Sequence, residues 1–353
     1  MLSGMILSAK ARELLTGTAE QGRIPGGTAA SGTLANDAPV FAFGKTSPGG
    51  ARVTPETRYD LASLTKVTAT LPSVLRLVAE GELDLDRELD AYFSNIGWFR
   101  TPSLAGATPR QLLAHNSGLP GWARLFAITT DRLVALGATQ QTPLQSAPGG
   151  AAVYSDLGFM LLGALVERVS RLRLDEFAAR HVFGPLGMGA TGFRPRGTPI
   201  EPGVTYAPTE DCGWRNRVLV GEVHDENCYA WEGVAGHAGL FGTARDLAAY
   251  CRAWLELDSR LGPEELLLEC LKPHAETATG ERRGLGWITG PDGMPGGLPG
   301  FGHTGFTGTS LWIDPSAERY AVLLTNRVHP DRNRDSGIVN LRKDFHRAVW
   351  EDA

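Results

Sequence analysis

Ser63-Leu64-Thr65-Lys66 is the single Ser-x-x-Lys pattern in the sequence, and it lies near the start of a periodic apolar run over 61–80 that predicts a helix. Residues three apart share a helix face, so the hydroxyl of Ser63 and the amine of Lys66 are within reach of each other. A serine becomes a nucleophile when a neighbouring base takes its proton, and a lysine whose pKa is lowered can be that base. The pattern alone also fits a surface lysine one turn from a capping serine.

Two further motifs carry groups suited to the same chemistry. Tyr154-Ser155-Asp156 begins an apolar helical pattern, and a tyrosine at such a position can point into a cleft, where its phenolate beside Lys66 would act as a general base. His303-Thr304-Gly305 stands just before a predicted strand at 309–314. A hydroxyl and an exposed backbone N–H at that position suit the binding of an acyl substrate and its oxyanion.

The order of predicted elements indicates an α+β fold with two lobes. Strand patterns lie near both ends of the chain, and helical patterns with Gly/Pro-rich loops fill the middle. The strand patterns are 27–34, 39–44, 284–289, 309–314 and 320–325, and the later helical patterns are 154–171, 174–182, 244–257, 263–271 and 335–351. This order predicts a sheet lobe formed by residues 1–70 and 283–353, with a mainly helical lobe, residues 71–282, inserted between them.

Composition excludes several classes of function. The 353-residue chain has 34 Lys+Arg against 39 Asp+Glu, a net charge of −5, which lacks the basic footprint of a protein that binds nucleic acid or anionic membranes. No run reaches the ~18 consecutive apolar residues of a membrane span. The four cysteines form no CxxC pair and are expected to be free thiols. The first residues have no basic and apolar leader pattern, so we expect a cytoplasmic location.

Two motifs that suggest cofactors lack the context those cofactors need. The stretch 300–305 matches G-x-G-x-x-G, but a Gly/Pro loop precedes it and a strand pattern follows, unlike a dinucleotide site. His224-Asp225-Glu226 carries metal-ligand side chains, but no HExxH or P-C-x-x-C accompanies it. We interpret it as a hydrogen-bonded loop and predict neither a metal ion nor an organic cofactor.

Taken together and in this order, Ser63-x-x-Lys66, Tyr154-x-Asp156 and His303-Thr304-Gly305 resemble the motifs of the serine penicillin-recognising superfamily. That superfamily comprises class C β-lactamases, D-Ala-D-Ala carboxypeptidases and their esterase relatives. The likeness covers about residues 20–350, including the stretches 79–85, 112–120, 236–241 and 286–287. It implies a β-lactamase/transpeptidase-like fold, with an antiparallel sheet flanked by terminal helices, an all-helical lobe, and the active site at their junction.

The resemblance also implies a role for each motif residue. Ser63 would be the acylated nucleophile, Lys66 its proton-transfer partner, and Tyr154 the general base in acylation and an activator of water in deacylation. The backbone N–H groups of Ser63 and Phe306 would form the oxyanion hole. The substrate-binding residues would be Asp156, His303, Thr304 and Gly305.

Two residues depart from the family pattern. Asp156 stands where the family has asparagine, and an ionised carboxylate can only accept hydrogen bonds. If ionised, it would hold Lys66 protonated and shift the base role toward Tyr154. His303 stands where most β-lactamases have a lysine, and an unperturbed imidazole is mostly neutral at pH 7. Both departures weaken the case for a strong β-lactamase.

We therefore expect a serine hydrolase that forms an acyl-enzyme on Ser63 and hydrolyses small ester or amide substrates. The main alternative is a D-alanyl-D-alanine carboxypeptidase or a weak class C-type β-lactamase of the same fold. A non-catalytic binding or scaffolding relative is the alternative of another class, motivated by Asp156. The expected partner is a small ester, amide or β-lactam-like molecule, and the sequence leaves open both the physiological substrate and the oligomeric state.

Overall fold

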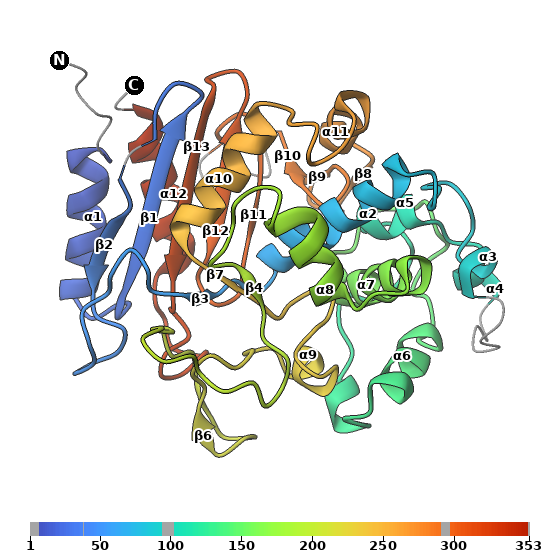
Figure 1. Ribbon diagram of the computed structural model, residues 1–353, viewed down its shortest axis with the longest axis horizontal. Coiled ribbons are helices and arrows are strands. Elements are labelled where there is room, and N and C mark those ends of the chain that lie inside the picture. The colour runs from blue at the N-terminus through green and yellow to red at the C-terminus, as the bar shows by residue number, and fades with distance from the viewer. Residues whose placement is uncertain (1–6, 38, 94–101, 291–296, 352–353) are drawn as a thin grey trace.

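An eight-stranded antiparallel sheet stands beside a group of helices in the computed structural model, which describes residues 7–37, 39–93, 102–290 and 297–351 (Figure 1). The strand order β2-β1-β13-β12-β11-β10-β9-β8 places strands from the two ends of the chain side by side. The strands are β1 Gly26–Thr33, β2 Phe41–Gly44, β8 Ala275–Glu276, β9 Arg282–Arg283, β10 Ile288–Thr289, β11 Phe301–Thr304, β12 Ser310–Asp314 and β13 Arg319–Thr325.

The pairing of β1 with β13 joins the two termini. It runs from Gly27 opposite Thr325 to Thr33 opposite Arg319, and β13 is buried from its second residue onward. Its alternate side chains serve two cores, with Ala321 in one hydrophobic cluster and Val322 in another. A strand covered on both faces reads as a continuous apolar run, as β13 does.

Helices cover both faces of this sheet. On one face, α1 (Ala9–Glu20) and α12 (Ile338–Glu351) pack on each other and share a hydrophobic cluster with the sheet. On the other face, α10 (Ala244–Leu255) packs on β1, β12 and β13 (Figure 1). The two terminal helices therefore pack on a sheet whose strands come from both ends of the chain.

The helical lobe surrounds α7 (Asp156–Ser170), whose residues from Leu157 to Val166 are all buried, as expected of a helix that is apolar on every side. Its other elements are α2 Leu71–Ala79, α3 Asp90–Phe93, α4 Pro102–Ala105, α5 Pro109–Leu113, α6 Arg132–Gln140, α8 Leu174–Ala178, α9 Glu226–Ala230 and α11 Glu264–Leu271, with π-helical turns at Lys66–Thr70 and Ala179–Phe183 and a 3-10 turn at Leu125–Ala127. Two small sheets complete the fold: β3 Tyr59–Asp60, β7 Leu240–Gly242 and β4 Gly192–Phe193 form one, and β5 Asp211–Cys212 with β6 Arg217–Val218 forms the other.

The predicted fold class is confirmed, since the antiparallel sheet, its terminal helices and the inserted helical lobe are all present. The predicted boundary at 282/283 is wrong in detail, because β8 and the first residue of β9 belong to the sheet and α10 packs on it. The strand predicted over 284–289 is also wrong in part. A turn at 284–287 with Gly286 at φ +81 separates β9 from β10.

Two further predictions, on membrane-spanning helices and on the cysteines, can be compared with the described residues. No helix among them is long and apolar enough to cross a membrane. All four cysteines are buried and free, as the sequence predicted. Residues 1–6, 38, 94–101, 291–296 and 352–353 of the two predicted lobes lie outside the described residues.

Candidate active site

The turn that carries Ser63 joins strand β3 to the helix that begins with the π-helical turn. Ala62, just before Ser63, has a left-handed φ of +48, a strained conformation that the surroundings must hold in place. The buried carboxylate of Asp60 accepts hydrogen bonds from the N–H of Ala62 at 2.8 Å and from the N–H of His224 at 2.7 Å. The serine is therefore presented on a fixed turn at a helix start.

Lys66 lies completely buried beneath Ser63. Its Nζ donates to Ser63 Oγ at 3.1 Å, to Asp156 Oδ1 at 2.6 Å and to the carbonyl of His237 at 3.3 Å. Burial lowers the pKa of Lys66, but the charge and hydrogen bond of Asp156, helped by Tyr154, outweigh burial and leave the pKa raised. Lys66 is thus an ammonium group, as the sequence predicted for an ionised Asp156.

Tyr154 stands just before α7, where Ser155 caps the helix by accepting the N–H of Gly158. Its ring lies 4.7 Å from the ring of His115, 4.8 Å from Lys66 Nζ and 5.2 Å from Arg283 Cζ. Lys66 and Arg283 place two positive charges against the ring of Tyr154. The tyrosine thus has the neighbours that a proton acceptor needs.

The residues that follow the third motif are hydrogen-bonded to the turn that carries Ser63. Thr307 Oγ1 donates to the carbonyl of Asp60 at 2.7 Å, and Thr309 Oγ1 donates to the carbonyl of Leu61 at 3.0 Å. Behind this turn, Arg342 of α12 donates to the carbonyl of Thr309 at 2.8 Å. The backbone N–H groups of Ser63 and Phe306 donate to no protein group within the described residues, so both remain available to an oxyanion.

His303 is buried, with Nδ1 2.8 Å from the carbonyl oxygen of Thr304. Burial, together with the charges of Arg283 and Lys66, lowers its pKa well below the ordinary value, so the imidazole is neutral at pH 7. The third motif therefore places no cation of its own beside the serine, in agreement with the expectation from the sequence.

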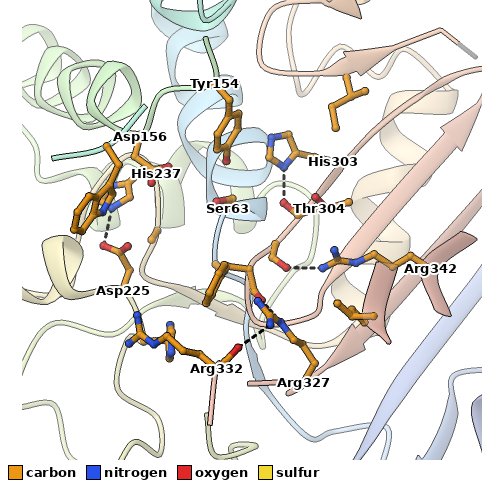
Figure 2. Close-up of a pocket in the computed structure, with 18 of the residues that line it drawn as sticks. Ser63, Tyr154, Asp156, Asp225, His237, His303, Thr304, Arg327, Arg332 and Arg342 are labelled. Carbon is orange, nitrogen blue, oxygen red and sulfur yellow. Dashed lines mark hydrogen bonds and ion pairs between the residues drawn. The ribbon is translucent and has the colours of Figure 1, made fainter. Parts of the chain in front are cut away.

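A cavity of about 630 Å³ brings the motifs together (Figure 2). Of the predicted site residues, its lining includes Ser63, Tyr154, Asp156, His303, Thr304, Gly305 and Phe306. Lys66 lies behind the wall and reaches the cavity through Ser63 and Asp156. All the residues singled out from the sequence therefore meet at one place, the junction between the sheet and the helical lobe.

Sequence reasoning missed the place of Arg283 and the contact between His237 and Asp225 in this cavity. Arg283 of β9 is buried, pairs with Glu281 through one nitrogen, and leaves Nε and Nη1 without a partner in the described residues. His237 Nε2 lies 2.8 Å from Asp225 Oδ1. No rule of sequence spacing predicts that Arg283, on a two-residue strand, lies near Ser63. Nor does such a rule predict that His237 contacts Asp225, twelve residues before it.

The stretch His224-Asp225-Glu226 is a hydrogen-bonded loop at the cavity wall. His224 lies 3.2 Å from Glu210, Asp225 holds His237, and Glu226 pairs with Arg332 at 2.6 Å. The three side chains thus turn to separate partners. Across the described ranges, no group of three or more His, Cys, Asp and Glu side chains is arranged to hold a metal ion.

We predict that Gly305→Ala lowers kcat/KM by about 10²-fold, the effect of misplacing one oxyanion donor. A Cβ at Gly305 would stand 2.1 Å from Thr309 Oγ1 and 2.6 Å from the carbonyl oxygen of Leu61, so the turn must move away from Ser63. Gly192→Ala is the matched control, because a Cβ there meets nothing within 4 Å. Steady-state kinetics on an ester substrate would contradict the prediction if both variants kept wild-type activity.

The chain is similar to known proteins. The family model described as Beta-lactamase matches residues 11–343. A curated protein of Salmonella paratyphi A, named "Putative D-alanyl-D-alanine carboxypeptidase", is 31% identical over 312 residues, which cover 79% of this chain and 71% of the relative.

Solved structures share the fold. The octameric penicillin-binding protein homologue from Pyrococcus abyssi has a TM-score of 0.78 at 21% identity, covering 97% of this chain and 77% of that one. EstCE1, a hydrolase with promiscuous acyltransferase activity, has a TM-score of 0.76 at 22% identity, covering 98% of each chain.

Proposed function

The chain belongs to the beta-lactamase family, whose members are generally serine hydrolases, and on that premise we propose that it hydrolyses small esters or amides through an acyl-enzyme on Ser63. The observation that carries this proposal is the position of Ser63 Oγ, 3.1 Å from the buried Lys66 Nζ and on the wall of a cavity of about 630 Å³. The unused N–H groups of Ser63 and Phe306 supply the oxyanion contacts that acyl transfer needs.

In the proposed reaction, the phenolate of Tyr154 takes the hydroxyl proton of Ser63 as Oγ attacks the carbonyl carbon. Lys66 donates a hydrogen bond to Oγ, which leaves the serine's own hydrogen free to point to another acceptor, and its charge stabilises the forming alkoxide. The proton then passes to the departing alcohol or amine as the bond to the carbonyl carbon breaks. A water molecule, activated by the same tyrosine, hydrolyses the acyl-serine.

A D-alanyl-D-alanine carboxypeptidase activity is the second candidate, favoured by Arg283. Its guanidinium lines the cavity, lies against the ring of Tyr154 and has two nitrogens without a protein partner among the described residues. A guanidinium on the cavity wall suits a substrate carboxylate, which the terminal residue of a peptide would provide. The name of the Salmonella relative points to the same reaction.

Covalent labelling tests the proposed function. We expect a fluorophosphonate to add one adduct to the wild-type protein and none to Ser63→Ala in an intact-mass measurement. A protein without a Ser63-dependent adduct would be a binding or scaffolding relative. Turnover of a short p-nitrophenyl ester, a chromogenic cephalosporin and an acyl-D-Ala-D-Ala peptide then ranks the activities, and cephalosporin turnover without esterase activity would overturn the order proposed here.

Tyr154→Phe is expected to lower kcat by about 10²–10⁴-fold, the usual contribution of a positioned general base. Because the same phenol oxygen is proposed to serve both half-reactions, single-turnover acylation and deacylation rates should both fall. Tyr92→Phe is the matched control, since the Tyr92 hydroxyl bonds only the backbone of Asp84, in the helical lobe. An unchanged pH–rate profile in Tyr154→Phe would remove the tyrosine from the proton path.

A further inference from the structure

Two carboxylates and an imidazole line one wall of the cavity. Figure 2 shows Asp156, His237 and Asp225 on one side of Ser63, across from His303 and Thr304. We call the first three residues the acceptor wall. They come from the start of α7 and from the loops on either side of α9, which the fold packs together beside the nucleophile.

His237 is the buried centre of the acceptor wall. Its side chain is 1% exposed, and its Nδ1 has no hydrogen-bond partner within the described residues. The loop reaches this depth because Gly236 lies against α7, where a Cβ would stand 1.9 Å from the carbonyl oxygen of Phe159. The His237 carbonyl also accepts Lys66 Nζ, so the imidazole stands beside the catalytic lysine.

Asp225 is the hydrogen-bond partner of the His237 ring. Burial raises the pKa of Asp225, but the charge and hydrogen bond of His237 and the N–H of Cys228 outweigh burial and hold the pKa well below its ordinary value. An ionised carboxylate only accepts, so His237 Nε2 is the donor in the 2.8 Å contact. The bonds from His237 and Cys228 both fall on Asp225 Oδ1, so Asp225 Oδ2 bonds no protein group within the described residues.

Asp156 places the acceptor wall close to the reacting carbonyl. Its Oδ1 accepts Lys66 Nζ, which also donates to Ser63 Oγ, so the carboxylate lies no more than two hydrogen-bond lengths from the nucleophile. Its Oδ2 bonds no protein group within the described residues. A group on the carbon next to the scissile carbonyl stands at a comparable distance from Oγ and can reach this oxygen.

An ammonium group is the complement of such a wall. It brings three N–H donors and a positive charge, whereas a neutral amide N–H brings one donor and no charge. Glu226, the next carboxylate along the chain, belongs to a separate ion-pair group, because it pairs with Arg332, which also pairs with Glu210. Asp156 Oδ2 and Asp225 Oδ2 are therefore the free carboxylate oxygens in the group around Lys66 and His237.

We propose that the acceptor wall is a subsite for a protonated α-amine, so that the preferred substrates are α-aminoacyl esters and amides, including peptides cut after a free N-terminal residue. This proposal rests on the proposed acyl-transfer function. It also gives Asp156 a use, since a carboxylate that cannot donate to a substrate carbonyl can accept from a substrate ammonium.

The test compares alanine p-nitroanilide with N-acetylalanine p-nitroanilide, each as both enantiomers. We expect wild-type kcat/KM to favour the free amine by at least about 10-fold, the effect of one hydrogen bond between charged groups. Asp225→Asn should lower this preference by about 10-fold while keeping the cap on α9, because asparagine caps helices as well as aspartate does. Glu226→Gln removes the same charge from the same loop and should leave the preference unchanged.

A wild-type preference near one would overturn the subsite, and so would an equal loss of preference in Asp225→Asn and Glu226→Gln. Binding to Ser63→Ala separates this inference from the proposed function, because it needs no chemistry. We expect calorimetry to show that Ser63→Ala binds alaninamide at least about 10-fold more tightly than N-acetylalaninamide. Equal affinities would refute the subsite even in a protein that labels at Ser63, whereas tight alaninamide binding without labelling would refute only the hydrolase.

Discussion

Ser63→Ala is expected to lower kcat/KM at least about 10⁴-fold, because the nucleophile of an acyl-transfer site has no substitute on the cavity wall. The folded state should hardly change. Lys66 keeps its bonds to Asp156 and to the carbonyl of His237, and only one oxygen is lost from a partly exposed position. We expect the free energy of unfolding to change by less than about 1 kcal/mol.

Kinetics on a p-nitrophenyl ester, together with urea unfolding, measures both quantities on one preparation. Ser170→Ala is a matched control, since Ser170 lies at the far end of α7 and bonds only the backbone of Leu172. Residual turnover in Ser63→Ala with a wild-type pH profile would mean that another group performs the attack. Loss of activity in both serine variants would point to instability rather than to chemistry.

The features predicted well from the sequence are those with local causes. Ser63 and Lys66 are three residues apart at a helix start, so their contact follows from helix geometry alone. The strand predicted at 309–314 is β12, Ser310–Asp314, because a continuous apolar run next to a turn leaves few other conformations. Asp156 was predicted to hold Lys66 protonated, and the 2.6 Å contact and the raised pKa of Lys66 both agree.

The features that were missed depend on contacts between distant segments. Arg283 lies on β9, a two-residue strand next to the edge strand β8, and such a strand is too short to leave a periodic pattern. His237 meets Asp225 through two loops whose course is set by packing against α7 and not by sequence spacing. The packing of α10 on the sheet could not be predicted from its sequence either, because its amphipathic face would fit against either lobe.

Lys66→Met is expected to lower kcat/KM about 10²–10⁴-fold and to destabilise the protein by about 3 kcal/mol. The activity falls because the ammonium that stabilises Oγ is lost. The stability falls because Asp156, 19% exposed, keeps a charge whose buried partner, 2.6 Å away, has gone. Kinetics and urea unfolding again measure the loss of activity and the loss of stability. The single variant cannot show whether one loss causes the other.

The double variant Lys66→Met/Asp156→Asn divides them. Replacing the carboxylate by a neutral amide removes the unpaired charge, so most of the lost unfolding free energy should return. The stability cost of Lys66→Met comes from the charge left without its partner, and not from the loss of a strongly stabilising ion pair. Activity should stay at the level of Lys66→Met, since neither new side chain can place a cation beside Ser63. A double variant that regained activity along with stability would show that Lys66 serves the fold and that the reaction proceeds without its charge.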